Sequence, residues 1–499
     1  MATTLSDGTL GDLPADLPRP TYDRAGLIAG IVHVGVGGFH RAHEAMYVDR
    51  LLSEGKARDF AICGVGVLPG DIRMAEVLDA QDGLYTLVEK APDGTMTPRV
   101  IGSIVDYLHA PSDPEAVLTK LADPATRIVS LTVTEGGYNI DAVTGEFAAD
   151  NSDVQHDLRR GGEPPRTTFG LVIEGLRRRR DAGIAPFTVM SCDNIEGNGH
   201  VAQRVFTAYA RLADPALGDW VEAEVRFPNS MVDRITPVTT DDDLALVRDL
   251  GVDDTWPVVC EPFTQWVLEE SFGPLGRPAF EDVGVQVVDD VRPYELMKLR
   301  LLNASHQSLC YFGYLSGYRL VHDVCQDDLF AQFLLAYMTL EASPTLDPVP
   351  GIDLDAYRRE LVARFSNANV RDTVARLCAE SSDRIPKWLL PVIREQITAG
   401  GPMERAAAVV ASWARYDEGV DEQGEPITIV DRLADSLKER ALQGGLVFVE
   451  DRTLFGDLVD EPRFVAAYTA ARESLHRDGA RATVEKLVAE GSLAAATTR

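Results

Sequence analysis

The sequence feature that most constrains the fold is a β-branched run that ends in a cluster of glycines and continues into helix-forming residues. The run covers residues 30–36, and the helical pattern covers residues 45–52. Strand, glycine turn and helix in this order are the context of a dinucleotide-binding motif. Gly35 permits the tight turn, and Gly37 lets the backbone approach a diphosphate at the helix N-terminus. His40 stands where the third glycine of the usual motif falls, so the spacing alone is equally consistent with an ordinary glycine turn.

Further strands and helices alternate along the first half of the chain. The expected strands are residues 61–67, 84–90, 99–105, 128–134 and 187–192, and the clearest expected helix is residues 167–181. This alternation predicts a mostly parallel sheet with helices on both faces. Ligands of such sheets bind beyond the carboxyl ends of the strands, which is where Gly35, Glu135 and Asn194 fall.

Asp71 follows the second expected strand, at the end of the sequence Leu-Pro-Gly-Asp. An acidic residue at this point can accept hydrogen bonds from the hydroxyls of an adenosine ribose and repel a 2′-phosphate. Asp71 therefore favours NAD over NADP. The alternative is a turn aspartate, which is common after Pro-Gly.

The sequence pattern changes near residue 290. From about residue 291 the chain shows almost continuous helical periodicity, interrupted by Pro-containing stretches that mark helix boundaries. We therefore expect an α/β protein with two domains. The first is a Rossmann-type domain with a surface arm at its N-terminus (residues 1–290), and the second is a mainly α-helical domain (residues 291–499). A chain of 499 residues is too long for one hydrophobic core, which agrees with this division.

The first helix of the second domain, expected from Pro293 onward, carries three polar residues on one broad side. Lys298, His306 and Asn303 fall at about 0°, 80° and 140° around the axis of an α-helix. A lysine, an imidazole and an amide that rise together from a half-buried helix can form an acid/base centre. The alternative is a lysine that reaches solvent from the helix edge beside a core histidine.

Charge and hydropathy exclude several classes of function. The net charge of −30 argues against binding to nucleic acid or to an anionic membrane, because phosphates would be repelled. No segment approaches 18 consecutive apolar residues, so we expect no membrane span. The N-terminus lacks a basic segment followed by an apolar run, and we therefore expect a cytoplasmic protein.

No segment has the spacing of a metal site. The six cysteines are scattered without a CxxC pair, so we expect reduced core residues and no zinc site. His40 and His43 straddle Arg41, but no cluster of carboxylates or cysteines accompanies them in the sequence. We expect these histidines to pack beside the cofactor, and we expect no metal.

Five motifs occur in an order that resembles the polyol-specific long-chain dehydrogenases. They are Gly35-x-Gly37-Gly38-Phe39-His40-Arg41-Ala42-His43, Thr134-Glu135-Gly136-Gly137-Tyr138, Ser191-Cys192-Asp193-Asn194, Pro228-x-x-Met231-Val232-Asp233-Arg234-Ile235-Thr236-Pro237 and Lys298-x-x-x-x-Asn303-x-x-His306. The resemblance extends from about residue 28 to about residue 485. It implies an oxidoreductase that acts on CH–OH groups with NAD and without a metal. The implied reaction is the reversible oxidation of D-mannitol at C2 to D-fructose, with D-arabinitol to D-xylulose as a further candidate.

The resemblance also implies roles for single residues. Lys298 would be the general base in oxidation and the general acid in reduction, a task for which burial or positive charge must lower the pKa of a lysine. Asn194 and Asn303 would hold the reacting oxygen and stabilise its alkoxide character. The residues implied to orient the substrate or to relay the proton are His306, Glu295 and Glu135. The residues implied to bind NAD are Gly35, Gly37, Gly38, Phe39, Arg41 and Asp71.

Two positions depart from the family pattern. Asp233 and Arg376 resemble residues that bind the polyol hydroxyls, but Arg384 stands where the mannitol enzymes carry a lysine, which changes the reach of the charge. The preference between C5 and C6 polyols is therefore open. Gly70 replaces the acidic residue that the family can place before Asp71, so rejection of NADP is expected to be weaker.

Two other functions remain open at this point. A fructuronate reductase of the same family needs a cationic clamp for a carboxylate, which Arg376 and Arg384 can supply. A non-catalytic NAD-binding protein is the other alternative, although binding alone does not need the lysine, the two amides and the histidine. The family suggests a monomer whose partner is a small polyol or ketose.

Overall fold

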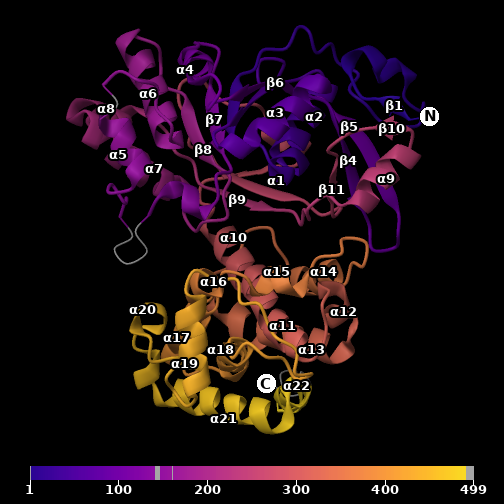
Figure 1. Cartoon of the computed structure of the whole chain (residues 1–499), viewed down its shortest axis with the longest axis vertical. Coiled ribbons are helices and arrows are strands. Elements are labelled where there is room, and N and C mark those ends of the chain that lie inside the picture. The colour runs from indigo at the N-terminus through magenta and orange to yellow at the C-terminus, as the bar shows by residue number, and fades with distance from the viewer. Residues whose placement is uncertain (1, 141–145, 160, 491–499) are drawn as a thin grey trace. The chain divides into compact units, whose positions relative to one another are not determined.

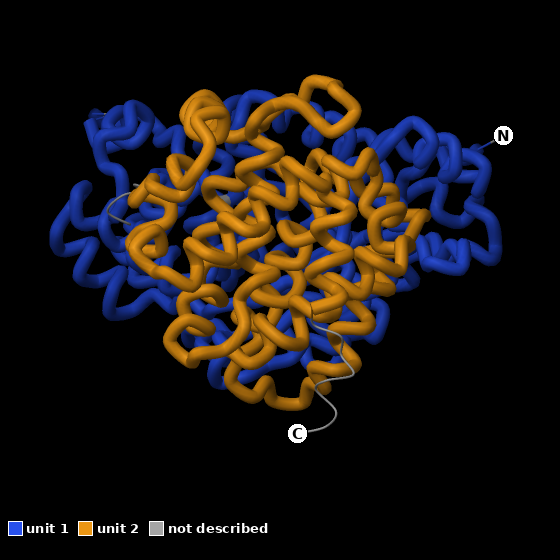
Figure 2. Tube along the Cα trace, turned by 90° about the horizontal axis from the view of Figure 1, so that it is seen from below, with its two compact units in different colours: residues 1–292 blue, residues 293–499 orange. Residues whose placement is uncertain are grey.

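The computed structural model describes residues 2–140, 146–159 and 161–490. The chain separates into two compact units, residues 1–292 and residues 293–499 (Figure 2). The first unit contains the strands, and the second is built from helices (Figure 1). Among the described residues, every helix is too short or too polar to span a bilayer.

A five-stranded parallel sheet forms the centre of the first unit. Its strands are β2 (Ile31–Val34), β3 (Ile62–Gly66), β6 (Ile104–His109), β7 (Ile128–Leu131) and β8 (Thr188–Ser191). They lie in the order β6-β3-β2-β7-β8, and all four pairings are parallel. The order reverses between β2 and β7, so their carboxyl ends meet at the topological switch point where such sheets bind ligands. The predicted Rossmann-type sheet is confirmed.

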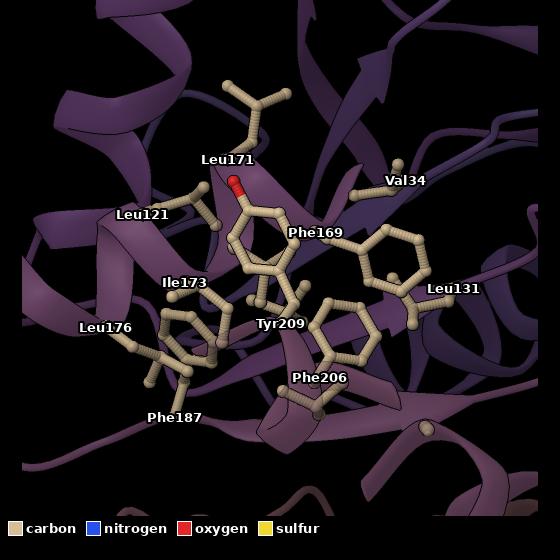
Figure 3. Close-up of a cluster of buried hydrophobic side chains, with 14 of the residues drawn as sticks. Val34, Leu121, Leu131, Phe169, Leu171, Ile173, Leu176, Phe187, Phe206 and Tyr209 are labelled. Atoms are coloured by element: carbon tan, nitrogen blue, oxygen red, sulfur yellow. The ribbon is translucent and has the colours of Figure 1, made fainter. Parts of the chain in front are cut away.

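Helices cover both faces of this sheet. The helices of the first unit are α1 (Gly38–Ala42), α2 (Glu44–Ser53), α3 (Ile72–Ala80), α4 (Pro114–Ala122), α5 (Ser152–Arg159), α6 (Thr168–Asp181), α7 (Asn198–Ala213), α8 (Pro215–Glu224) and α9 (Asp241–Asp249). Val34 and Leu131 lie in one hydrophobic cluster with side chains of α4, α6 and α7 (Figure 3). Ile31 and Ile128 lie in a second cluster with side chains of α2 and α3. Successive residues of one strand therefore face opposite sides, as the pleat requires.

Smaller sheets complete the first unit. They contain β4 (Tyr85–Lys90), β5 (Met96–Ile101) and β11 (Val258–Cys260); β9 (Ser230–Asp233), β12 (Gln265–Glu269) and β13 (Gln286–Val288); and β1 (Thr3–Thr4) with β10 (Val252–Asp253). The single strand expected over residues 99–105 is wrong, because β5 ends at Ile101 and β6 begins at Ile104. Between them the Gly102 N–H donates to Asp49 Oδ1 over 3.0 Å, and the Gly102 carbonyl accepts from Arg24, so neither group is available for a strand ladder.

The N-terminal arm packs into the first unit, whereas an arm on the surface was expected. β1 pairs with β10, and Leu5, Leu13 and Leu17 are buried in a cluster with side chains of β4 and β5. Arg24 adds hydrogen bonds from its guanidinium to the carbonyls of Gly102 and Ile104. The expectation of a surface arm overlooked these leucines because they are separated by polar and Pro-containing segments.

The second unit is an assembly of helices joined by short turns. They are α10 (Arg292–Met297), η5 (Lys298–Asn303), α11 (Ala304–Leu315), α12 (Val321–Gln326), α13 (Asp328–Ala336), η6 (Tyr337–Ala342), η7 (Ser343–Thr345), α14 (Leu354–Phe365), α15 (Val374–Cys378), α16 (Ser381–Trp388), α17 (Leu390–Ala399), α18 (Glu404–Tyr416), α19 (Ala434–Gln443), α20 (Arg452–Phe455), η8 (Leu458–Asp460), α21 (Pro462–Asp478) and α22 (Ala480–Ala489). The alanine-rich α18 is buried along most of its length and packs against α11 and α21. Small side chains allow this close approach.

A buried carboxylate fixes the start of α18. Glu341, on η6, accepts hydrogen bonds from the backbone N–H groups of Arg405 (2.9 Å) and Ala406 (2.8 Å), and its carboxylate lies 3.3 Å from the Arg405 guanidinium. It thereby caps a helix N-terminus from another element. Burial raises the pKa of Glu341 from 4.5 to about 7, against the opposing effect of these donors.

This carboxylate is expected to make stability depend on pH. The folded state holds the Glu341 proton more tightly than the unfolded chain does, so its contribution to the free energy of unfolding falls as pH rises from about 4.5 to about 7. The full difference is about 3 kcal/mol. Glu341→Gln removes the titration. The stability advantage of the wild-type protein over this variant, measured by urea unfolding, should therefore shrink between pH 5 and pH 8. Glu404→Gln, at an exposed position in the first turn of α18, is the matched control. A constant difference for Glu341→Gln would contradict the assignment.

Candidate functional site

The glycine turn after β2 has the geometry that its sequence predicts. Gly35 has a φ of +94°, and a Cβ added there would lie 2.3 Å from the Thr132 carbonyl oxygen, so only glycine fits. Gly37 is extended and directly precedes α1, and a Cβ there would meet no atom closer than 3.9 Å. Neighbouring atoms therefore leave no room for a side chain at Gly35, on the side of β7, whereas there is room beside the backbone at Gly37.

A buried hydrogen-bond chain supports this turn. The Thr132 hydroxyl donates to the Gly35 carbonyl over 2.8 Å, and His33 Nε2 lies 2.8 Å from the same hydroxyl oxygen. Because the hydroxyl proton is used on the carbonyl, His33 Nε2 must be the donor to Thr132. His33 Nδ1 lies 2.8 Å from Ser130 Oγ and 3.0 Å from Glu44 Oε2. His33 is thus a core histidine whose hydrogen bonds connect β2 with the end of β7, and its ring also lies beside the carboxylate of Glu44 on α2.

A carboxylate that sequence analysis did not connect with the histidines lies beside His33 and His40. His33, His40 and Glu44 are all buried, and they offer possible metal-ligand atoms within 4.8 Å of one another. However, the rings of His33 and His40 stack at 3.5 Å with planes 15° apart, so their in-plane lone pairs run parallel instead of converging on one ion. Burial holds the pKa of His40 well below its usual value, with the neighbouring His33 as a further cause. A packed histidine pair fits this geometry better than a metal centre, and the absence of a metal remains a prediction.

The two side chains expected to reach NAD from α1 have different surroundings. Phe39 is half-buried, and its ring stacks on that of His43 at 4.9 Å. Arg41 is buried, donates to the Trp256 carbonyl and lies over the ring of Tyr85 at 5.3 Å. Arg41 therefore joins α1 to the loop before β11, and its contact with a cofactor remains a prediction.

Asp71 lies just beyond β3, in the short helix η2 (Pro69–Asp71). Its Oδ2 accepts the Leu68 N–H over 2.9 Å, as a turn aspartate would. Its Cβ is close to the end of β3, because a Cβ added at Gly66 would lie 2.6 Å from it. The two interpretations of Asp71 are compatible, since the turn that it closes also brings its carboxylate to the carboxyl edge of the sheet.

An aspartate that sequence analysis did not single out organises the ends of β7 and β8. Asp193 accepts the N–H groups of Val133 (3.1 Å) and Thr134 (2.8 Å) and the hydroxyl of Tyr138 (2.8 Å). It holds Thr134 at a φ of +64°, a rare conformation for a residue with a side chain. Asn194, the next residue, is half-buried, whereas the side chain of Glu135 lies outside the described part of the chain. The signal was present in the Ser-Cys-Asp-Asn motif, in which only the asparagine was assigned a role.

Arg234, the residue after Asp233, has a structural role. Asp233 is buried at the end of β9, and Arg234 follows it. The Arg234 guanidinium donates to the carbonyls of Ala42 (2.7 Å) and Glu261 (3.0 Å) and to the carboxylate of Glu89 (2.5 Å). Arg234 therefore connects the end of α1 with two smaller sheets, which explains an arginine inside this motif.

In the second unit, the helix with the expected acid/base residues contains a π-helical turn. η5 spans Lys298–Asn303, and the Ala304 N–H donates to the Leu299 carbonyl five residues earlier. A π turn takes in one residue more than an α-helical turn, so the angle between Lys298 and Asn303 is smaller here than the roughly 140° expected for an α-helix, and that expectation is wrong. Lys298 and Asn303 are 7% and 6% exposed, and Asn303 Oδ1 is buried without a hydrogen-bond partner among the described residues.

The other two polar residues of this helix lie on either side of the π turn. Glu295 is buried on α10, and His306 is nearly buried on α11 with its ring 4.5 Å from that of Phe365. The structure therefore gathers four polar side chains on one continuous, largely buried helix.

The two arginines expected to bind substrate are held by different partners. Arg376 is exposed, and its guanidinium forms a two-pronged ion pair with Asp372, which raises the pKa of Arg376. Arg384 Nη1 lies 3.2 Å from the carbonyls of Arg376 and Leu377, and its guanidinium lies 5.7 Å from the centre of the Trp388 ring. The positive charge of Arg376 is thus already balanced by a carboxylate.

The chain is similar to known proteins over nearly its whole length. Residues 29–282 match the family model of the mannitol dehydrogenase Rossmann domain, and residues 290–476 match that of the mannitol dehydrogenase C-terminal domain. The chain is 48% identical to a mannitol 2-dehydrogenase of Phaeosphaeria nodorum over 470 residues, which are 93% of this chain and 82% of that protein.

Two solved structures extend this similarity to the fold. A ternary complex of Pseudomonas fluorescens mannitol 2-dehydrogenase with NAD and D-mannitol has a TM-score of 0.90 and 46% identity, covering 98% of this chain and all of that one. A substrate-free D-sorbitol dehydrogenase has a TM-score of 0.88 and 41% identity, covering 96% of this chain and all of that one. On the evidence of both domain matches and these full-length similarities, the chain belongs to the mannitol dehydrogenase family, whose members are polyol-specific long-chain dehydrogenases.

Proposed function

We propose that this protein is an NAD-dependent polyol dehydrogenase that interconverts D-mannitol and D-fructose by oxidation or reduction at C2. The observation that carries the proposal is the π turn, which brings a buried lysine and a buried asparagine toward the same side of one helix, the asparagine with an amide oxygen unpartnered among the described residues. A substrate hydroxyl can donate to this oxygen, and the NH2 group of the same amide can donate to the reacting oxygen. The relatives named mannitol 2-dehydrogenase, one of them solved with NAD and D-mannitol, support the choice of substrate and cofactor.

In the proposed mechanism, a side chain of the protein takes up and returns the proton of the reacting hydroxyl. NAD supplies the hydride acceptor in oxidation, and its reduced form supplies the hydride donor in the reverse direction. Lys298 takes the proton of the C2 hydroxyl during oxidation and returns it during reduction. Asn303 and Asn194 donate amide hydrogens to the reacting oxygen, which stabilises its alkoxide character without a metal. The residues proposed to orient the substrate or to pass the proton onward are His306, Glu295 and Glu135.

The residues of the first unit suit a dinucleotide. The open backbone at Gly37 lies at the topological switch point of the sheet, where a diphosphate can accept hydrogen bonds from N–H groups. Asp71 retains one carboxylate oxygen, Oδ1, for a ribose hydroxyl, because Oδ2 is engaged by Leu68. The complete set proposed to hold NAD is Gly35, Gly37, Gly38, Phe39, Arg41 and Asp71.

The pairing of Arg376 favours a neutral substrate. A fructuronate carboxylate would need free positive charge, but Arg376 is engaged by Asp372. A polyol hydroxyl can instead share the arginine–aspartate pair as both donor and acceptor. We therefore assign Asp233, Arg376 and Arg384 to the hydroxyls of the polyol, with D-arabinitol as a second substrate. The resemblance to a D-sorbitol dehydrogenase adds D-sorbitol as a candidate.

One set of assays tests the proposal. NADH oxidation is measured with D-fructose, D-xylulose and D-fructuronate, and NAD reduction with D-mannitol, D-arabinitol and D-sorbitol. We expect D-fructose and D-mannitol to give the highest kcat/KM, NADPH to be a poorer donor, and EDTA to leave the rates unchanged. Activity with D-fructuronate alone would exclude the mannitol reaction, and loss of activity in EDTA would exclude the metal-free mechanism. Size-exclusion chromatography tests the expected monomer.

A further inference from the structure

We infer that Tyr337 and the Arg300–Glu395 ion pair are positioning elements that hold the π turn of η5 open and thereby keep Lys298 and Asn303 toward the same side of the helix. This inference rests on the proposed function, because it assumes that Lys298 is the acid/base residue. Tyr337 and Glu395 lie outside the motifs from which the catalytic residues were predicted, and Arg300 occupies an unspecified position in one of them. Tyr337 and Glu395 both act through Arg300, which lies in the middle of the π turn.

The first support is a hydrogen bond to the backbone of the turn. A π turn replaces i→i−4 hydrogen bonds by longer i→i−5 ones and leaves a carbonyl to be satisfied from outside. Tyr337 Oη donates to the Arg300 carbonyl over 3.2 Å, and both groups are buried. Burial keeps the pKa of Tyr337 well above its usual value, with the nearby Glu341 as a further cause, so the hydroxyl remains a donor.

The second support is the anchoring of the Arg300 side chain. Its guanidinium forms a two-pronged ion pair with Glu395 of α17 at 2.6 and 2.9 Å, and it also donates to the Thr345 carbonyl at the end of η7. Arg300 is 7% exposed, so this planar pairing is shielded from solvent on the arginine side. The backbone and the side chain of one residue are therefore both tied to later elements of the same unit.

The consequence concerns the relative direction of two side chains. If the π turn closed to an α-helix, the residues before it would rotate by about 100° relative to those after it. Lys298 and Asn303 would then separate around the axis, and one reacting oxygen could not meet both. Tyr337 begins a second π turn, η6, which packs against η5, so the two irregular turns support each other.

The test replaces the hydroxyl and keeps the ring. In Tyr337→Phe we expect kcat to fall roughly 10- to 100-fold, as for a misplaced catalytic group. KM for NAD should change less than twofold, and the acidic limb of the kcat–pH profile of D-mannitol oxidation should move to higher pH as Lys298 becomes less confined. Tyr468→Phe, which removes a buried hydroxyl from α21 in the same unit, should retain the wild-type kcat and profile. Glu395→Gln, at a partly exposed carboxylate, should show the same direction as Tyr337→Phe with a smaller effect.

Two results would overturn the inference. One is a wild-type kcat and pH profile in Tyr337→Phe, and the other is an equal loss in Tyr468→Phe, which would indicate a general effect of core polarity. A crystal structure of the variant gives a readout that does not depend on the substrate. Retention of the Ala304–Leu299 hydrogen bond with Lys298 and Asn303 still toward the same side of the helix would refute the inference even if the wild-type protein oxidised no polyol. If Tyr337→Phe does not fold, the same measurements on Glu395→Gln decide the question.

Discussion

Replacement of Lys298 by alanine is expected to lower kcat for D-mannitol oxidation and D-fructose reduction roughly 100- to 10,000-fold, the range that general acid–base catalysis contributes. The lysine is buried in the π turn, so water cannot easily take over the proton transfer. Because the side chain belongs to the helical unit, the Rossmann-type sheet should remain intact, and the dissociation constant of NADH should be unchanged. Steady-state kinetics and a fluorescence titration with NADH measure the two quantities.

The interpretation of Lys298→Ala needs a matched control and a rescue. Lys438→Ala removes an exposed lysine from α19 of the same unit and should retain full activity. Added primary amines should restore part of the activity of Lys298→Ala, with larger rescue by more basic amines of similar size. Full activity of Lys298→Ala would remove the lysine as the acid/base residue, and a parallel loss of NADH binding would indicate a structural role instead.

The second large effect is expected for Gly35→Ala. The φ of +94° at Gly35 is strained for any residue with a Cβ, and this Cβ would lie 2.3 Å from the Thr132 carbonyl oxygen in the neighbouring strand. Strain and overpacking together should reduce the free energy of unfolding by roughly 2 to 5 kcal/mol. The turn must shift to relieve the contact, so NADH should bind at least about tenfold more weakly, which corresponds to about 1.4 kcal/mol.

Urea unfolding and NADH titration test this prediction. Gly11→Ala is the control, because a Cβ at that position in the short helix η1 (Asp7–Asp12) would meet no atom within 4 Å and φ lies outside the left-handed region. It should change neither quantity. Unaltered NADH affinity in a correctly folded Gly35→Ala protein would refute the proposed cofactor role of the turn.

The sequence predicted the central sheet because its signals are local. The β-branched runs, the glycine at Gly35 and the helices that follow are each determined by neighbouring residues, and their alternation leaves few topologies. The break at Gly102 was missed because its cause lies elsewhere: Asp49 and Arg24 take the backbone groups that a continuous strand would use. Helical periodicity in the second half was equally local and was predicted for the same reason.

Only some residues of the candidate site could be predicted from their neighbours in the sequence. Lys298, Asn303 and His306 were recognisable by their spacing, and Asp71 and Asn194 by their places after strands. Asp193 and Arg234 stood inside recognised motifs, but their tasks depend on backbone groups from distant segments. Glu44 could not be connected with His33, because that contact exists only when α2 packs against β2 and β7.

The sequence by itself determined the Rossmann-type sheet, the helical second half and the identity of the polar residues offered for chemistry. Only the tertiary structure decided the angle between Lys298 and Asn303 around the helix axis. Helical periodicity separated them by about 140°, whereas the π turn makes this angle smaller. The physical reason is that a π turn is unfavourable in isolation and persists only where surrounding groups satisfy it. Those groups, Tyr337 and Glu395, are 37 and 95 residues away from Arg300 in the chain.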